Sequence, residues 1–492
     1  MNPLTAITTY IPGPWFEKTL LLLTTSELIE DMLVICPELV DIKIPKSRVV
    51  KGGGLQSQKT LAHVIDEART RYLLFLAGTK QIAIEPGVLE RLVATAESTK
   101  AGIVYSDFYD EGEQGRVLHP LNDYQLGSIR DDFDFGRIML FSTEAARKAL
   151  EKYGEIPGVT YAGLYDLRLK ISIDHPIHHL PEPLYSVLSP GEPSGDKKLF
   201  AYVDPRNRDV QKEMEVVFTD YLKKIGAYLS PVLLRQAGQF AEALPVEASV
   251  IIPVRNRVGT VADAVQSAIS QETDFSFNVI VTDNHSTDGT TDILSDLTVR
   301  HPALKHIIPK RTDLGIGGCW NEAINSQFCG RYAVQLDSDD LYGSIGTLQK
   351  IVDTLRNGKY AMVIGSYTIV NSRFEEIPPG FIDHREWTVE NGHNNALRIN
   401  GLGAPRAFDT SIIRKIGFLN VSYGEDYAAA LAICREYRIG RIYKSLYLCR
   451  RWEGNTDAAL TIEEANRNDA FKDKIRTEEI LARQEKTAGV NT

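Results

Sequence analysis

Long apolar runs and regularly spaced cysteines are both missing from this 492-residue chain. The early run Leu20–Leu23 is far shorter than the ~20 apolar residues that cross a bilayer, so no membrane span is expected. The start, Met1–Pro3, lacks the basic residues of a signal peptide. The five cysteines are odd in number, scattered and without CxxC spacing. These absences favour a reduced, cytoplasmic protein.

Basic residues are also in deficit. The chain has 55 Lys and Arg against 65 Asp and Glu, for a formal net charge of −10. General nucleic-acid binding needs a basic footprint, so this function is not expected. Adhesion to an anionic membrane surface is disfavoured for the same reason. The length exceeds the roughly 250–300 residues at which a single core usually splits, so two domains are expected.

Two halves of the chain repeat one another. Arg71–Leu76 resembles Arg331–Leu336, and Ala101–Tyr109 resembles Ala361–Ile369, each pair lying 260 residues apart. Three further pairs keep the same order at a similar spacing: Leu89–Val93 with Leu348–Val352, Phe141–Thr143 with Phe408–Thr410, and Pro183–Tyr185 with Ser445–Tyr447. Five correspondences in one order favour duplication over chance.

The boundary between the halves is expected near Lys223–Glu247, before a fresh buried strand at Ala248–Pro253. We therefore expect domains at residues 1–240 and 246–492. Strand-like and helix-like segments alternate in both, which predicts α/β domains with mostly parallel sheets flanked by helices. The segment Thr461–Gln484, rich in Glu, Lys, Arg and Ala, is expected to form an exposed amphipathic helix.

A cluster of carboxylates follows one strand of the second half. Asp337, Asp339 and Asp340 lie within four residues, and such crowding is unfavourable unless something positive sits among them. Ligands bind at the carboxyl ends of strands in open α/β sheets. The cluster predicts a Mg²⁺ or Mn²⁺ ion that bridges to a diphosphate, with a polar turn as the alternative. The first half has Ala77–Lys80 here, without carboxylates, so it is expected to be non-catalytic and to serve packing, dimerisation or acceptor binding.

Three more motifs precede this cluster in a characteristic order. They are Ser249–Arg257, Asn278–Thr290 and the glycine-rich Leu314–Asn321. With Asp337–Asp340 they make the second half resemble glycosyltransferase family 2, the nucleotide-sugar-dependent enzymes with the GT-A fold. The resemblance covers roughly residues 246–455. It implies two tandem GT-A-type domains, of which the first resembles the family only in its framework.

The resemblance assigns roles to individual residues. It implies that donor contacts come from Pro253, Arg255, Asn256, Asp283, Asn284, Asp337, Ser338 and Arg451. Asp283 would accept hydrogen bonds from the base, although helix capping is an alternative. Asp339, with Asp337, would hold Mn²⁺ or Mg²⁺, which neutralises the departing diphosphate. Two positions depart from the family pattern: Asn284 replaces an Asp, and Trp320 replaces an Arg that often precedes the Asn.

The family also places a Glu-Asp pair at the start of a helix near the sugar. Here the pair is Glu425-Asp426, so the resemblance implies Asp426 as the base for an inverting transfer, with Glu425 in support. Ordinary helix capping is the alternative for Asp426. Weaker acceptor candidates are Trp387 and His393, in a polar segment before this helix, and Trp452 after it.

The predicted function is transfer of a sugar from a nucleotide diphosphate to a hydroxyl of a glycan, polysaccharide or glycoconjugate. The default donor is a UDP-sugar. The alternatives are a non-catalytic sugar-nucleotide-binding scaffold and a sugar-phosphate nucleotidyltransferase. The second would need a glycine-rich basic loop after the first strand, and Arg255 and Arg257 stand there without one. A homo-oligomer or a glycan-assembly partner is compatible with this reading.

Overall fold

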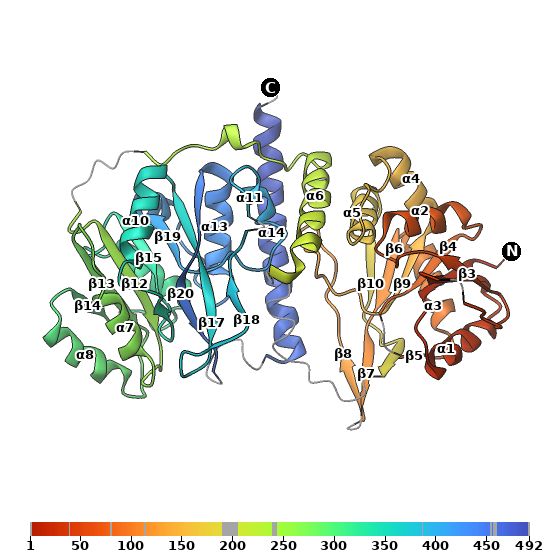
Figure 1. Ribbon diagram of the computed structural model, residues 1–492, viewed down its shortest axis with the longest axis horizontal. Coiled ribbons are helices and arrows are strands. Elements are labelled where there is room, and N and C mark those ends of the chain that lie inside the picture. The colour runs from red at the N-terminus through yellow and green to blue at the C-terminus, as the bar shows by residue number, and fades with distance from the viewer. Residues whose placement is uncertain are drawn as a thin grey trace.

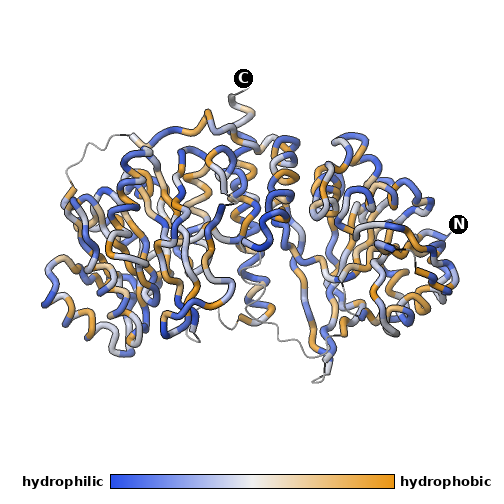
Figure 2. Tube along the Cα trace, viewed as in Figure 1, coloured by the Kyte–Doolittle hydropathy of each residue, from blue (hydrophilic) through white to orange (hydrophobic). Residues whose placement is uncertain are grey.

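The computed structural model describes residues 2–38, 40–78, 81–112, 115–188, 205–238, 244–385, 387–452, 455 and 460–490. Two α/β halves lie side by side, with the last helix, α14 (Ile462–Val490), standing between them (Figure 1). The hydrophobic segments concentrate in the strands and on the helix faces that cover them (Figure 2). The α/β class predicted from the alternating segments is confirmed.

The first half is built on a sheet in the order β10-β6-β9-β4-β1-β2-β3, in which only β9 runs antiparallel to its neighbours among the described strands. Its strands are β1 (Leu4–Thr9), β2 (Ile29–Cys36), β3 (Ser47–Lys51), β4 (Tyr72–Leu76), β6 (Ile103–Ser106), β9 (Ile138–Ser142) and β10 (Ile177–Leu180). Its helices are α1 (Pro14–Thr24), α2 (Gln58–Glu67), α3 (Val88–Thr99), α4 (Thr143–Tyr153) and α5 (Gly163–Asp174). A smaller sheet has the order β5 (Gln81–Ile84), β11 (Tyr185–Leu188), β7 (Phe108–Gly112) and β8 (Gly115–His119).

The second half has one larger sheet, in the order β14-β13-β12-β15-β19-β17-β20-β16, with β18 paired to β17. Its strands are β12 (Ala248–Val254), β13 (Phe277–Asp283), β14 (Leu304–Ile307), β15 (Tyr332–Gln335), β16 (Leu341–Tyr342), β17 (Met362–Val370), β18 (Glu376–Ile382), β19 (Arg406–Asp409) and β20 (Ile439–Arg450). Its helices are α7 (Val261–Ile269), α8 (Thr290–Arg300), α9 (Ile316–Asn325), α10 (Thr347–Gly358), α11 (Gly392–Asn395), α12 (Thr410–Ile416) and α13 (Glu425–Glu436). Between the halves lie η1 (Pro205–Asn207), α6 (Arg208–Lys224) and η2 (Pro231–Leu233).

The two sheets have the same strand order. Read from one edge, β3-β2-β1-β4-β9-β6-β10 matches β14-β13-β12-β15-β19-β17-β20, and β9 and β19 are the equivalent antiparallel strands. The small sheet β5-β11-β7-β8 likewise matches β16-β20-β17-β18, because the long strands β17 and β20 run through both layers. This agreement supports the internal duplication inferred from the sequence, which stays a hypothesis.

The prediction of an exposed C-terminal helix is wrong. In α14 the side chains of Asp473, Arg476 and Arg483 have no solvent exposure, and Ile475 and Ile480 belong to a core that also contains residues of both halves. Charged residues in a helix normally indicate a solvated face. Here the charged side chains pair with one another inside α14 and also with segments far away in the chain, such as the one that contains Arg130, which the helical pattern of α14 does not reveal.

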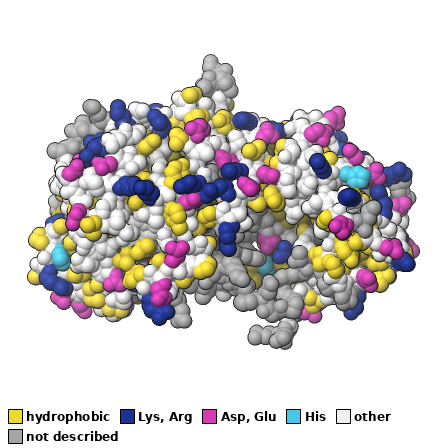
Figure 3. Space-filling model, viewed as in Figure 1, with side chains coloured by type: hydrophobic (Ala, Val, Ile, Leu, Met, Phe, Trp, Pro, Cys, Tyr) yellow, Lys and Arg dark blue, Asp and Glu magenta, His cyan; other side chains and the backbone are white. Residues whose placement is uncertain are grey.

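The surface of the molecule carries both signs of charge. In one view, Lys and Arg side chains form a row across the middle of the second half, and acidic side chains are scattered around them (Figure 3). Within the described ranges, no helix has the length and apolar character needed to cross a membrane.

Replacing Arg476 should destabilise the protein strongly. The variant Arg476→Ala would leave the buried carboxylate of Asp473 without its 2.7 Å ion pair, and breaking one partner of a buried pair costs about 3–5 kcal/mol. The midpoint of chemical denaturation measures the effect. Lys474→Ala, on the exposed side of the same helix, should leave the midpoint unchanged. Equal midpoints for the two variants would contradict the assignment.

Candidate active site

The carboxylate of Asp283 lies at the carboxyl end of β13 and is fully buried. It accepts hydrogen bonds from the backbone N–H of Ser286 (3.0 Å) and the Thr291 hydroxyl (2.6 Å), and it lies 3.3 Å from His306 Nε2. Burial alone would raise the pKa of Asp283, but these partners hold it well below its usual value. Asp283 is therefore a fixed anion at the edge of the sheet.

The loops after β12 and β13 are tied to each other beside this anion. The side-chain oxygen of Asn256 accepts a hydrogen bond from the backbone N–H of Thr287 at 2.8 Å. The backbone N–H of Asn256 donates to Ser286 Oγ at 3.0 Å. Asn284 donates through Nδ2 to the Leu314 carbonyl (2.8 Å), while its buried Oδ1 has no partner among the described residues. A buried acceptor without a donor is costly, so this atom is suited to a donor group on a ligand. Near it, Pro253 is half-buried and Arg255 is exposed.

The acidic cluster follows β15 at the same edge. Asp337 accepts from Gln335 Nε2 at 2.9 Å, and Asp340 accepts from the Arg450 N–H at 2.7 Å. Burial, with the neighbouring carboxylates, raises the pKa of both Asp337 and Asp340. Ser338 between them is buried. The crowding of acidic groups predicted from the sequence is thus present, and a cation would relieve it.

Trp452 contacts this cluster directly. Its indole N–H donates to Asp339 Oδ2 at 3.2 Å, and the guanidinium of Arg257 lies 6.0 Å from the centre of a Trp452 ring. Asn455 donates to the same Asp339 oxygen. The backbone N–H of Arg451 bonds to the Val370 carbonyl, which fixes the start of this segment beside the cluster. The structure thus brings together Trp452 and the acidic residues that the sequence connects only through the resemblance.

The carboxylates of Glu425 and Asp426 begin α13, after Gly424 in a left-handed conformation (φ 80°). Asp426 forms an ion pair with Arg406 at 2.8 Å. Burial opposes ionisation, but Arg406 and Lys472 hold the pKa of Asp426 below its usual value. Burial and the adjacent Asp426 raise the pKa of Glu425 to about 8, and its Oε2 has no partner in the described part of the chain. One carboxylate of the pair is therefore ionised at neutral pH and the other is largely protonated.

Arg406 was not identified from the sequence as a site residue. It begins β19, and its guanidinium also interacts electrostatically with Asp337 and Glu425. It therefore links the acidic cluster to the helix that carries Asp426. The signal in the sequence was a difference between the two repeats. Phe141 and Phe408 occupy matching registers, so the first half has Met139 at the position of Arg406.

A comparison with known protein families identifies the family that the sequence around this site matches. The model of glycosyl transferase family 2 matches residues 249–416, which hold the loops after β12 and β13, the acidic cluster and Arg406. This part of the chain is therefore a glycosyl transferase family 2 domain, as the four motifs predicted. A comparison with curated proteins gave no significant match.

Several solved glycosyltransferase structures are similar to this chain. One is S. aureus TarS 1–349 in complex with UDP-GlcNAc, at 22% identity and a TM-score of 0.37, over 48% of this chain and 72% of that one. Another is the mannosyltransferase PcManGT from Pyrobaculum calidifontis in complex with GDP-Man and Mn²⁺, at 15% identity and a TM-score of 0.35, over 56% and 83%. A third is GalNAc-T7 with UDP, GalNAc and Mn²⁺, at 13% identity and a TM-score of 0.34, over 54% and 57%.

Two of the acceptor candidates of this glycosyltransferase need correction. His393 is 2% exposed, and its Nε2 lies 2.7 Å from the Leu229 carbonyl. Trp387 is also 2% exposed, and the Arg441 guanidinium lies 5.1 Å from the centre of its ring. The polar segment around them was predicted to contact the acceptor, but contacts with residues such as Leu229 and Arg483 bury it. Neither side chain is available to an acceptor.

The matching positions of the first half lack the acidic cluster and keep one carboxylate in a different environment. Ala77 follows β4 where the second half has Asp337, while Thr79 and Lys80 lie outside the described residues. Asp166, at the place of Asp426, is buried in an ion pair with Lys170 at 2.7 Å. Lys170 also donates to the carbonyls of Gly154 and Glu155. The carboxylate that survives in the first half is therefore neutralised inside its own helix.

The burial of His393 predicts a pH-dependent stability. Burial lowers the pKa of His393 to about 4, against about 6.5 in an unfolded chain, so the unfolded state binds more protons between these values. Stability should fall as the pH drops through this window, by roughly 2–3 kcal/mol in total for this group. His393→Gln should make the denaturation midpoint less dependent on pH between 7 and 4. A variant with the same pH dependence as the unmodified protein would show that His393 does not titrate this way.

Proposed function

We propose that this chain transfers a sugar, with inversion, from a nucleotide diphosphate donor to a hydroxyl of a carbohydrate acceptor. The observation that carries the proposal is that the carboxylates of the family 2 domain form two groups with different electrostatic surroundings. Asp426 is kept ionised by Arg406, while the separate cluster Asp337–Asp340 gathers acidic groups at the strand edge. The first group suits proton removal and the second suits cation binding.

The donor residues of the acidic cluster fit a divalent cation. Asp337 and Asp339 offer hard oxygen ligands, which Mg²⁺ and Mn²⁺ prefer. Within the described ranges, no group of three or more His, Cys, Asp or Glu side chains is placed to hold a metal alone. A cation held by one or two carboxylates takes its remaining ligands from substrate phosphates and water, as is usual for Mg²⁺. When bound, the ion would neutralise charge on the departing diphosphate.

A separate set of residues would bind the base and ribose of the donor. The buried Asn284 Oδ1 lacks a donor, and the Asp283 anion lies next to it in the chain, so both would accept N–H groups of a base or ribose hydroxyls. Arg451 follows β20, which pairs with β16 directly after the acidic cluster, and would supply charge-assisted hydrogen bonds to phosphate. A UDP-sugar is the donor class to test first.

The chemical step uses Asp426 as the base. Asp426 accepts the proton of the acceptor hydroxyl as its oxygen forms the bond to the anomeric carbon. The bond from that carbon to the diphosphate oxygen breaks, and the diphosphate leaves with the electron pair. Attack opposite the leaving group inverts the stereochemistry. Arg406 keeps Asp426 ionised before the step, and the largely protonated Glu425 does not compete for the same proton.

Removing the carboxylate of Asp426 should abolish turnover but not donor binding. We expect Asp426→Asn to lower kcat by roughly 10²–10⁴-fold, the usual contribution of a general base. Release of UDP from a panel of UDP-sugars with Mn²⁺ measures turnover, and calorimetry measures donor affinity. Asp166→Asn changes the matching carboxylate of the first half and should keep normal turnover per folded molecule. Full activity in Asp426→Asn would refute the assignment of the base.

Removing Asp339 should uncouple nucleotide binding from the metal. We expect the affinity for UDP, measured by calorimetry, to rise on addition of Mn²⁺ in the unmodified protein and to stay unchanged in Asp339→Asn. The physical reason is that the carboxylate supplies a charge that the metal needs on the protein side. Asp353→Asn, on the outer helix α10, is the matched control. An Asp339→Asn variant in which Mn²⁺ still tightens UDP binding would contradict the metal assignment.

A further inference from the structure

Helix α14 is locked to a loop of the first half, which we call the 120–132 loop. Asn466 donates to the Pro120 carbonyl at 2.6 Å, and Gln125 donates to the Ala470 carbonyl at 3.1 Å. At Gly127 the two backbones touch so closely that an added Cβ would lie 1.8 Å from the Asp473 carbonyl oxygen. The fit leaves no space for a side chain at this position, so the loop determines where the helix lies.

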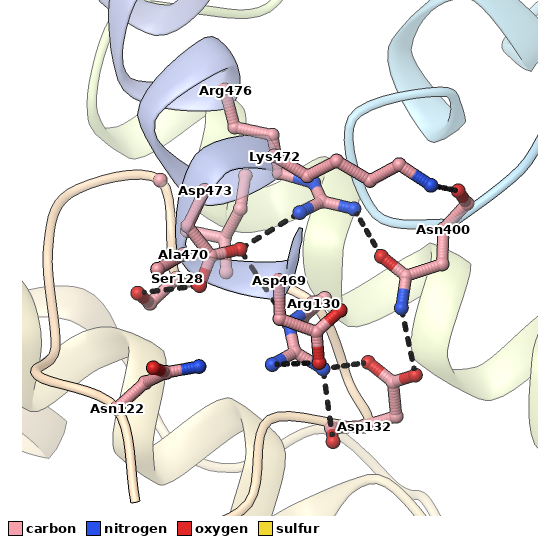
Figure 4. Close-up of polar contacts among 12 residues, drawn as sticks. Asn122, Ser128, Arg130, Asp132, Asn400, Asp469, Ala470, Lys472, Asp473 and Arg476 are labelled. Atoms are coloured by element: carbon pink, nitrogen blue, oxygen red, sulfur yellow. Dashed lines mark hydrogen bonds and ion pairs between the residues drawn. The ribbon is translucent and has the colours of Figure 1, made fainter. Parts of the chain in front are cut away.

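Buried charges continue this contact. Arg130 of the loop lies 3.0 Å from Asp469 and 3.5 Å from Asp473, while Asp473 pairs with Arg476 at 2.7 Å (Figure 4). The side chain of Arg130 is only 5% exposed. Charges this deeply buried are tolerated only when paired, so each of these side chains depends on the others.

Helix α14 also contacts the first turn of α13. Arg476 donates to the hydroxyl of Tyr427 at 3.1 Å, and Tyr427 directly follows Asp426 in the chain. The Lys472 ammonium lies 4.3 Å from the ring centre of Tyr423 and 5.6 Å from that of Tyr427. Its Nζ also donates to the Asn400 carbonyl at 2.7 Å. Lys472 is thus held on the segment that carries Asp426.

Asn400 joins the two sets of contacts. Its side chain accepts from Arg476 at 2.7 Å and donates to Asp132 of the 120–132 loop at 3.2 Å, and its carbonyl holds Lys472 (Figure 4). Phe471 and Ile475 of α14 lie against Gly424, 3.4 Å from the position of a Cβ there. The contacts run without interruption from the first half, through α14, to the first turn of α13.

We propose that Lys472 is a positioning residue for Asp426, and that the first half, through Arg130 and the 120–132 loop, holds Lys472 in place. The first half then acts as a built-in support for the catalytic base. This inference rests on the proposed role of Asp426. Three ionisable groups interact with that carboxylate: Arg406 from β19, Glu425 from α13 and Lys472 from α14.

The test compares Lys472→Met, Lys472→Arg and Lys474→Met in the full-length protein. Turnover is UDP release, with Mn²⁺, from the UDP-sugar that the unmodified protein uses. We expect Lys472→Met to lower kcat by roughly 10- to 100-fold, as displacement of a catalytic group does, with little change in KM for the donor. Lys472→Arg should restore most of the loss. Lys474→Met, on the exposed side of the same helix, should match the unmodified protein.

Hydrogen–deuterium exchange provides a measurement that does not need turnover. In Lys472→Met and in the milder Arg130→Lys, peptides covering residues 421–430 should exchange faster while the central strands β12 and β15 stay protected. Protected strands show that each variant is folded. Unchanged exchange at 421–430 in both variants would overturn the inference, whatever the activity.

The two proposals fail in different ways. If the unmodified protein releases UDP and Asp426→Asn does not, but Lys472→Met has the kcat of Lys474→Met, the positioning role of Lys472 is wrong. If Asp426→Asn is as active as the unmodified protein, the assigned base is wrong, and the exchange experiment alone decides whether α14 holds this segment.

Discussion

Charge that is buried must be paired, and this constraint organises the molecule. Arg476 has no solvent exposure, and its guanidinium is satisfied by Asp473, Asn400 and backbone carbonyls. Its partner Asp473 in turn interacts with Arg130 of the first half. Removing any one of these groups would strand another away from water. The interface between the halves therefore cannot loosen gradually, and the helix between them has one position.

The same constraint works at the site. Arg406 lies among three carboxylates from two segments of the chain, and its pairing with Asp426 separates the proton affinities of two adjacent acids. The first half shows the arrangement without this cation: Met139 replaces Arg406, Ala77 replaces Asp337, and Tyr165 replaces Glu425. These three groups thus differ together between the halves, and the remaining Asp166 is paired with Lys170 instead. This pattern is expected if they act as one unit.

Local patterns allowed much of the fold to be predicted. Buried strands such as Ala248–Val254 follow from runs of β-branched residues, and the order of the four motifs indicates the family from the sequence alone. What failed were inferences about availability and exposure. Trp387 and His393 were predicted as acceptor contacts and the charged α14 segment as an exposed helix, yet segments distant in the chain cover them. Arg406 was missed because its importance comes from carboxylates about 20 and 70 residues away along the chain, and no spacing rule connects them. The roles of the donor residues stay predictions.

The contact between Gly127 and the Asp473 carbonyl also bears on how the protein is made. Its two sides are separated by about 345 residues, and the later one lies in the first half of α14. During synthesis the first half can form its sheet early, since domains generally fold as units from the N-terminus. Its loop then holds Arg130 and Ser128 without their acidic partner until residue 473 has been added. The contacts proposed to support Asp426 can therefore form only after residue 473 has been added, when all four motifs of the second half have already been made.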